Sequence, residues 1–228
     1  MKEHRNMIKI FSIGDCNTKG IKELEFNSYP ERLGKKLNAS VFNYGFTMSS
    51  TREGKRIFNK FYNDSFDIIT IQFGLVDSWK TFKYSPYVLY YPNNFLRKMG
   101  RKFLKKYKKL IKKCNFYDFF GMKNVVDIEE YERNIRDLLF KINKNNFVLL
   151  IDTIPNKELS RNVEIKKYNQ ILKKLSGEYN NCIHINLFNE FENNFDKYYY
   201  DKTHINSMGY DFITQKILSI IDLERKKV

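Results

Sequence analysis

The sequence predicts an α/β protein in which helices cover both faces of a parallel sheet. Five short apolar runs are typical of strands buried on both sides: Ile8–Ile13, Val41–Tyr44, Asp67–Phe73, Asn146–Ile154 and Cys182–Leu187. Helical patterns lie between these runs along the chain. Strands that alternate with helices form βαβ units, and such units align the strands of one sheet in parallel.

Each predicted helix has a start or stop signal of its own. Small polar residues cap helix starts because their side chains accept hydrogen bonds from free backbone amides, and Gly is common just after helix ends. The predicted helices are Tyr29–Leu37 after Ser28, Arg52–Tyr62 after Ser50 and Thr51, Ile128–Ile142 after Asp127, and Val163–Leu175 before Gly177. A last helix with a broad apolar stripe follows His204.

Length and composition favour one globular domain. The chain has 228 residues, of which 42% are hydrophobic and 16% aromatic, with only 4 Pro and 10 Gly, so a disordered or collagen-like protein is excluded. We expect a single domain over residues 1–228 with a basic, aromatic-rich insertion at about 78–120. Within it, Tyr84–Pro92 suits the lining of a sugar or acyl pocket and equally suits packing.

The charge of the chain is concentrated in the insertion. Lys and Arg number 41 against 26 acids, a net charge of +15, and Arg97–Lys113 alone holds ten basic residues and no acid. Apolar residues from Phe95 to Cys114 recur at helical spacing between the basic ones, which predicts a basic amphipathic helix. Its stripe either packs on the domain or binds an anionic membrane surface or acidic glycan; nucleic acid is the least favoured partner, because no binding motif accompanies the charge.

The cysteines and the N-terminus bear on location. The chain has three cysteines, Cys16, Cys114 and Cys182, which is an odd number, and no two of them form a CxxC pair. We therefore expect free thiols in a reducing compartment. The N-terminus lacks an apolar signal core, and no apolar run has the length of a membrane span. The expected location is cytoplasmic, with peripheral binding at the inner membrane surface as an extension. No His, Cys, Asp or Glu cluster has metal-ligand spacing, so neither metal nor cofactor is expected.

Two segments carry nucleophile chemistry. Ser12-Ile13-Gly14-Asp15-Cys16-Asn17-Thr18 places a thiol just beyond the first predicted strand, and Asp201 stands three residues before His204. A thiol, an imidazole and a carboxylate are the parts of an activated nucleophile. The alternatives are a buried structural thiol, a helix-capping or core imidazole and a loop carboxylate. His184 alternates with Ile on a predicted strand, and we expect it to be structural.

These blocks resemble those of the SGNH (GDSL-type) hydrolase superfamily over nearly the whole chain. Gly14 and Asp15 match the first block, in which Cys16 takes the place of the nucleophilic serine. Gly45 matches the second block, and Asp201 with His204 the last. The resemblance implies a three-layer α/β/α sandwich with a central parallel sheet, of the SGNH or flavodoxin-like kind, and an esterase activity.

The third block departs from the family pattern. Gly74-Leu75-Val76-Asp77 has valine where the family has the asparagine that donates to the oxyanion, which leaves the backbone amides of Cys16 and Gly45 as donors. Loss of one such donor costs roughly 100- to 1,000-fold in turnover. We expect Asp15, and Asp77 in the same way, to bond backbone amides rather than to act on substrate. Gly45 and Gly74 are expected where backbones approach closely, or in ordinary turns.

The leading hypothesis is an acyl esterase with a Cys16–His204–Asp201 triad and a thioester intermediate. The resemblance of residues 74–113 to a branch associated with surface polysaccharides implies an O-acyl, for example O-acetyl, group on a carbohydrate. The same triad supports an acyltransferase, because water and an alcohol can both resolve a thioester. The hypothesis from another class is a catalytically weakened protein that binds a glycan or an anionic surface, with Cys16 marking lost or altered activity.

Overall fold

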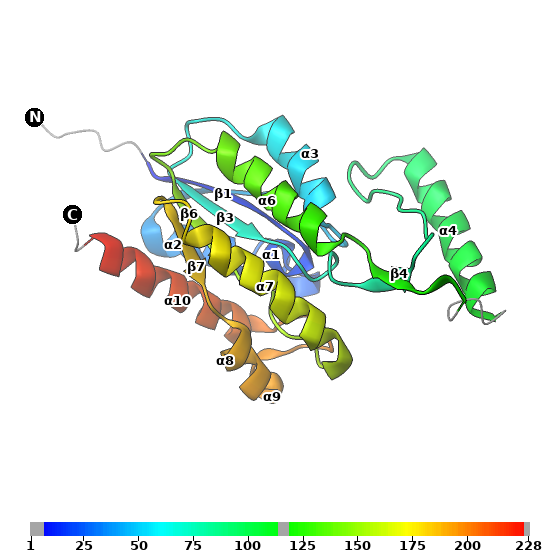
Figure 1. Ribbon diagram of the computed structural model, residues 1–228. Coiled ribbons are helices and arrows are strands. Elements are labelled where there is room, and N and C mark those ends of the chain that lie inside the picture. Colours follow the sequence, from blue (N-terminus) through cyan, green and yellow to red (C-terminus); the bar gives the residue numbers. More distant parts are fainter. Residues whose placement is uncertain (1–6, 114–118, 226–228) are drawn as a thin grey trace, which may run out of the picture.

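The computed structural model describes residues 7–113 and 119–225, and its centre is a five-stranded parallel sheet (Figure 1). The strand order is β2-β1-β3-β6-β7, and every neighbouring pair is parallel. The strands are β1 (Lys9–Gly14), β2 (Ser40–Asn43), β3 (Ile68–Gln72), β6 (Phe147–Ile151) and β7 (Cys182–Ile185). All five predicted strands are confirmed, with ends that differ by up to three residues.

Helices cover both faces of the sheet. The main helices are α2 (Tyr29–Leu37), α3 (Thr51–Phe61), α6 (Ile128–Lys141), α7 (Asn162–Ser176) and α10 (Ser207–Arg225). Neighbouring residues of one strand enter different cores: Phe11 packs with side chains of α3, α6 and α7, whereas Ile10 packs with side chains of α2 and α10. This alternation is the period of a strand buried on both faces. The three-layer α/β/α sandwich is therefore confirmed.

The predicted helix starts rest on the expected caps. Ser28 and Ser50 each form a capping box with the Glu three residues later, and the Asp127 side chain accepts the amide of Glu130. These caps fix where α2, α3 and α6 leave the loops at the sheet edge. Shorter helices complete the loops: α1 (Cys16–Lys19), α8 (Phe188–Asn193), α9 (Phe195–Tyr198) and the 3₁₀ turns at Lys22–Leu24 and Leu159–Arg161.

The insertion forms a separate arm beside the sandwich, as Figure 1 shows. It contains the predicted amphipathic helix, α4 (Phe95–Lys113), and a two-stranded antiparallel sheet of β4 (Lys80–Phe82) with β5 (Met122–Asn124), which the sequence did not predict. Residue Cys114, at the end of the predicted stripe, lies outside the described residues. Among the described helices, none is long and apolar enough to span a lipid bilayer.

The apolar stripe of α4 is largely uncovered. Leu96, Phe103 and Leu110 are 77%, 65% and 57% exposed, and only Ile111 among the residues of this helix is buried. The alternative in which the stripe packs on the domain is therefore wrong for these three side chains. Elsewhere, Cys16 and Cys182 are buried free thiols, as predicted.

Candidate active site

The turn after β1 presents Cys16 at the carboxyl edge of the sheet. Asp15 caps α1 by accepting the Asn17 amide at 2.9 Å, which is the backbone role expected for it. A side chain at Gly14 would come within 2.6 Å of the Gln72 carbonyl oxygen, so only glycine fits between β1, β3 and α1. As the first residue of α1, Cys16 has a backbone N–H without an acceptor inside the helix.

The loop before α10 pairs Asp201 with His204. The His204 Nδ1 lies 2.8 Å from Asp201 Oδ2, and Asp201 Oδ1 accepts the backbone amides of Thr203 and His204 at 2.7 and 2.8 Å. Partial burial works to raise the pKa of Asp201, but these hydrogen bonds outweigh it and lower that pKa. The carboxylate thus holds Nδ1 and leaves Nε2 as the ring nitrogen that can accept a proton.

The fold brings this loop against the Cys16 turn. The side chain of Asn17, next to Cys16, donates to the carbonyl oxygen of Thr203, next to His204, at 3.5 Å. The loop after β6 also holds Thr203, because the side-chain amide of Asn156 donates a hydrogen bond to the Thr203 hydroxyl at 2.9 Å. Within the described part of the chain, no hydrogen bond joins Cys16 Sγ to His204; the sulfur faces the backbone amides of Cys16 and Asn17 and packs in an apolar cluster with Leu75, Ile165 and Phe188.

The environment keeps the Cys16 thiol protonated. Burial raises its pKa well above the usual range, and the neighbouring Asp15 carboxylate acts in the same direction. Burial also raises the pKa of Asp15, to about 7. A preformed thiolate is therefore disfavoured, and nucleophilic chemistry at Cys16 requires a base.

The second block places Gly45 against α1. A Cβ at Gly45 would lie 2.4 Å from the Lys19 backbone nitrogen, so the close approach expected for this glycine is present. Its amide, the expected oxyanion donor, donates to Asn43 Oδ1 at 2.9 Å. An oxyanion would therefore compete with Asn43 for this N–H.

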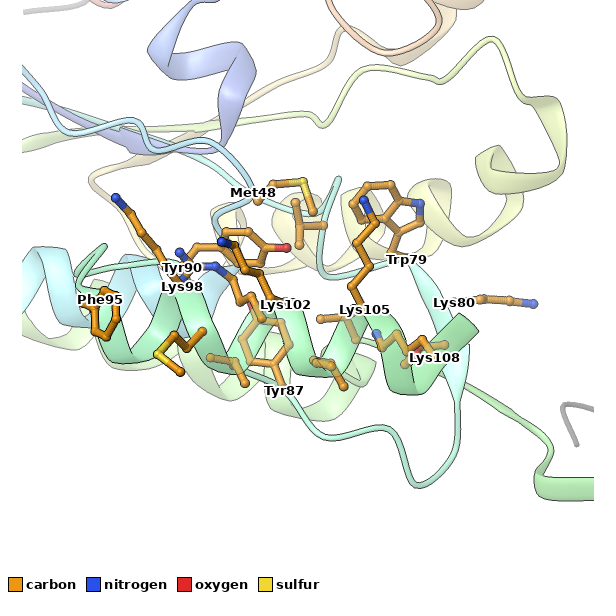
Figure 2. A pocket seen from close by; sticks show the side chains of 17 residues that line it. Met48, Trp79, Lys80, Tyr87, Tyr90, Phe95, Lys98, Lys102, Lys105 and Lys108 are labelled. Atoms are coloured by element: carbon orange, nitrogen blue, oxygen red, sulfur yellow. The ribbon is translucent and has the colours of Figure 1, made fainter. Parts of the chain in front are cut away.

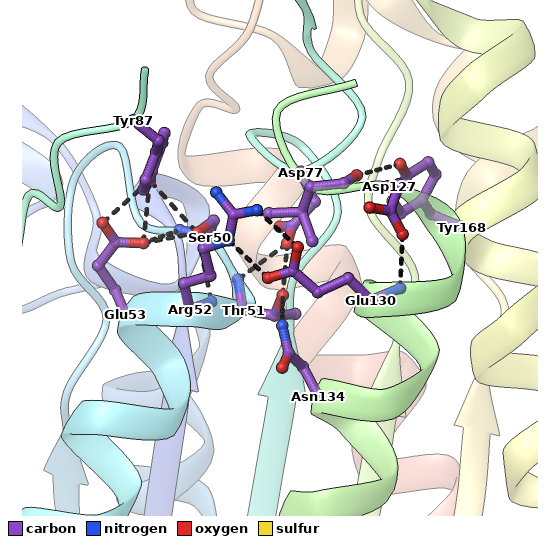
Figure 3. A network of polar contacts seen from close by, with 11 residues as sticks. Ser50, Thr51, Arg52, Glu53, Asp77, Tyr87, Asp127, Glu130, Asn134 and Tyr168 are labelled. Atoms are coloured by element: carbon purple, nitrogen blue, oxygen red, sulfur yellow. Dashed lines mark hydrogen bonds and ion pairs between the residues drawn. The ribbon is translucent and has the colours of Figure 1, made fainter. Parts of the chain in front are cut away.

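The third block is built around backbone geometry rather than polar donors. Gly74 has φ +137°, and a Cβ there would meet Thr153 Oγ1 at 2.5 Å. Val76 is buried and carries no donor. Asp77 accepts the amide and hydroxyl of Thr51 at 2.9 and 2.6 Å and so caps α3, within the polar network of Figure 3. Burial raises the pKa of Asp77 to about 7.

A cavity of about 600 Å³ lies next to this block, between α4 and the sandwich (Figure 2). Of the three residues considered for a substrate pocket, Gly74, Val76 and Asp77, only Val76 is among its lining residues. Tyr87, Val88 and Tyr90 from the aromatic segment line it as well, so this part of the insertion does border a pocket.

Sequence reasoning missed Arg161. Its Nη2 donates to the Leu75 carbonyl oxygen at 3.0 Å, and its guanidinium carbon lies 4.6 Å from the centre of the Trp79 ring. Burial lowers the pKa of Arg161, while the nearby carboxylates of Glu158 and Asp15 act against this. The signal available was its position in the loop after β6, since the loops at the carboxyl edge of a parallel sheet gather around one site.

A second His–Asp pair connects β6 and β7. His184 Nε2 is 2.7 Å from Asp152 Oδ1, and Asp152 Oδ2 accepts the Leu187 and Phe188 amides that begin α8. His184 belongs to β7, so the pair ties β6, β7 and α8 together, which fits the expected structural role. Within residues 7–113 and 119–225, no group of three or more His, Cys, Asp or Glu side chains is placed to hold a metal ion.

Comparisons with known proteins agree on the architecture. No family model and no curated protein matches the chain. Among solved structures, a catalytic mutant of the acetylxylan esterase Axe2 from Geobacillus stearothermophilus superposes with a TM-score of 0.63 at 17% identity, over 93% of both chains. A lipolytic G-D-S-L family protein from Veillonella parvula gives 0.62 at 13% identity, over 93% of this chain and 97% of that one.

A third structure extends the same pattern. The hydrolase LAE5, from the metagenome of Lake Arreo, has a TM-score of 0.62 at 15% identity and covers 93% of this chain and 94% of its own. The matches extend over nearly the full length of each protein, so the whole sandwich is shared. The chain therefore has the fold of the GDSL-type esterases.

Proposed function

We propose that the protein is an acyl esterase that removes O-acyl groups, such as acetyl, from a carbohydrate. The observation that carries the proposal is the contact of the Cys16 turn with the Asp201–His204 loop, made through Asn17 and Thr203. This contact supports the proposal because it brings the turn that holds Cys16 against the loop that holds His204, at the carboxyl edge of a parallel sheet, where active sites of such folds gather. The neighbour named an acetylxylan esterase supports an acetylated sugar as substrate.

The proposed reaction follows from the arrangement of the three groups. His204 Nε2 takes the thiol proton, Cys16 Sγ attacks the acyl carbonyl, and the resulting oxyanion accepts the Cys16 and Gly45 amides. His204 then protonates the departing sugar oxygen, which leaves a thioester that water hydrolyses with the same base. Asp201 stabilises the imidazolium. Substrate must bring Sγ to Nε2, a contact that catalytic groups often complete only in the substrate complex.

An acyltransferase would use the same thioester with a sugar hydroxyl in place of water. Release of free acetate separates the two activities, because transfer moves the acetyl group to the acceptor and yields no acetate. The second candidate is a glycan- or surface-binding protein with weakened catalysis. Val76 and the apolar surroundings of Cys16 Sγ favour that candidate.

We also propose that α4 binds an anionic membrane surface. Leu96, Phe103 and Leu110 form an exposed apolar side, and Lys106, Lys109, Lys112 and Lys113 of the same helix are exposed and do not line the cavity. Such a helix lies in the interface plane and attracts anionic lipid. The proposal predicts co-sedimentation with phosphatidylglycerol vesicles and loss of it in Phe103→Ser; equal binding to phosphatidylcholine vesicles would contradict it.

The esterase proposal is tested by acetate release from acetylated xylo-oligosaccharides. The expected result is turnover that disappears in Cys16→Ala and in His204→Ala. Cys182→Ala is the matched control, because Cys182 is also a buried free thiol but lies on β7 in a core cluster. Acetate release that survives in Cys16→Ala would contradict the triad and favour the binding-protein candidate.

A further inference from the structure

The cavity next to the third block has an aromatic wall and a cationic wall. The sandwich side contributes Val76 and Trp79, and the insertion contributes Tyr87 and Tyr90. The opposite wall is α4, which supplies basic side chains over three turns together with the apolar side chains of Phe95, Met99 and Leu104. A volume of about 600 Å³ is within the range of small-ligand sites, roughly 300–1,000 Å³. The cavity is thus large enough for a sugar residue with its substituents.

The cationic wall lacks compensating charge. The cavity is lined by Lys98, Lys102, Lys105 and Lys108 of α4, and none of these forms an ion pair with another described residue. No acidic residue is found among the described side chains that line it. Figure 2 shows the Lys105 side chain extending from α4 into the cavity.

The remaining basic residues of the cavity are already engaged. Lys80 is paired with Glu164 at 3.7 Å and points away from the cavity in Figure 2. Arg101 donates to the Leu89 carbonyl oxygen and to Asn93 Oδ1, and it lies over the Tyr90 ring at 4.7 Å.

Burial lowers the pKa of Lys108, which shows that its ammonium group is partly desolvated without a counter-charge. Ammonium groups that line one cavity attract an anion into it.

Two sets of contacts connect residues that line the cavity with the segment that borders Cys16. Val76 lines the cavity and follows Leu75, which packs in one cluster with Cys16. Trp79 lines the cavity and lies under Arg161, whose other contact is the Leu75 carbonyl oxygen. A group bound in the cavity would therefore sit beside the segment that borders the thiol.

From this arrangement we propose that the cavity binds the negatively charged part of the acylated substrate, a sugar that carries a carboxylate or a phosphate. The unpaired lysines of α4 contact the anion, and Trp79, Tyr87 and Tyr90 pack against the sugar ring. The inference deepens the proposed esterase function and rests on it, because the bound sugar is a substrate only if the protein is an esterase. Binding itself can be measured without catalysis.

The binding experiment uses Trp79 as its reporter. Trp79 is the only tryptophan of the chain and lines the cavity, so its fluorescence reports occupancy directly. The full chain is titrated with glucuronic acid, with glucose phosphorylated at its primary hydroxyl, and with glucose. We expect Kd for at least one charged sugar to be about tenfold below that for glucose, with the difference shrinking as salt is added. The charged sugar that binds identifies the anion as carboxylate or phosphate.

Two triple variants separate a built site from general attraction. Lys98→Gln/Lys102→Gln/Lys105→Gln removes three charges that line the cavity. Lys106→Gln/Lys109→Gln/Lys112→Gln removes three exposed charges of the same helix that do not line it. We expect the first variant to lose the preference for charged sugars and the second to keep it. An equal loss in both variants, or equal Kd for glucose and the charged sugars in the parent, would overturn the proposal.

A kinetic arm keeps this inference separate from the esterase proposal. Acetate release is followed with the tetra-O-acetyl esters of the same three sugars. The expected result is a higher kcat/KM for the charged ester that binds than for the neutral ester, and loss of this ratio in the cavity variant. Cys16-dependent release without charge preference would overturn the cavity proposal and leave the esterase standing. Selective binding of a charged sugar without Cys16-dependent acetate release would overturn the esterase proposal and leave the cavity as an anion-binding site.

Discussion

The buried carboxyl of Asp77 should make folding stability depend on pH in a way that one substitution removes. Asp77 is completely buried; its Oδ1 accepts two hydrogen bonds from Thr51, and its Oδ2 has no partner among the described residues. Burial raises the pKa from the ordinary value of 3.8 to about 7, with the nearby Glu53 carboxylate adding to the effect. Asp77→Asn keeps the acceptor for Thr51 and removes the titrating group.

The sign follows from where the proton binds. Between about pH 4 and pH 7 the folded chain holds a proton at Asp77 that the unfolded chain has released, so proton binding favours folding at low pH. The contribution is complete below the unfolded pKa and is lost as the pH rises through about 7. A difference of about three pKa units corresponds to about 4 kcal/mol. The free energy of unfolding of Asp77→Asn relative to the parent should therefore rise by about that much between pH 4 and pH 8.

Urea unfolding at a series of pH values measures this difference directly. Asp196→Asn is the control, because it makes the same substitution at a fully exposed side chain, so the pH dependence of its stability should follow that of the parent. A difference between Asp77→Asn and the parent that stays constant with pH would refute the reasoning, since it would mean that Asp77 titrates alike in the folded and unfolded chains.

Three further substitutions test the site. Asp201→Asn should lower kcat for acetate release by about 100-fold, because it removes the charge that attracts the imidazolium. For two unit charges about 4 Å apart, this attraction is worth roughly 1 kcal/mol in water and roughly 4 kcal/mol near a protein surface. An unchanged kcat would exclude a role of Asp201 in orienting His204. Val76→Asn should raise kcat by up to about 100-fold if its amide reaches the oxyanion, with Val76→Leu as the size control; equal kcat values in the two variants would show that position 76 does not face it. Arg161→Gln should shift the Trp79 emission and lower the free energy of unfolding by about 1 kcal/mol, and an unchanged spectrum would exclude the ring contact.

The fold was predictable because its signals are local. Apolar runs mark strands buried on both faces, and Ser28, Ser50 and Asp127 cap helices through hydrogen bonds within a few residues. The capping role of Asp15 and the close approach at Gly45 were predictable for the same reason, since each depends on one turn and its neighbouring strand.

Contacts between distant segments were not predictable in this way. The Asn17–Thr203 hydrogen bond joins residues 186 positions apart, and Arg161 gains its place only by packing on Leu75 and Trp79. The Gly45 amide was expected as an oxyanion donor, and no signal in the sequence indicated that it donates to Asn43. Such contacts depend on how the loops meet at the sheet edge, which periodicity and capping signals do not specify.

The amphipathic pattern of α4 predicted the helix correctly but not its surroundings. Its spacing requires an apolar side and a basic side, and it is silent on what each side meets. In the structure the basic side lines the cavity with Lys98, Lys102 and Lys105, and much of the apolar side is exposed. Of the two alternatives for the stripe, packing on the domain and binding an anionic surface, the exposure of Leu96, Phe103 and Leu110 favours the second.

The central claim is that Cys16 is a working nucleophile served by His204, and intact-protein mass after brief exposure to para-nitrophenyl acetate tests it most directly. The account predicts one added acetyl group that disappears in Cys16→Ala and forms more slowly in His204→Ala, with Cys182→Ala behaving as the parent. No adduct, or an adduct indifferent to Cys16→Ala and His204→Ala, would contradict the account.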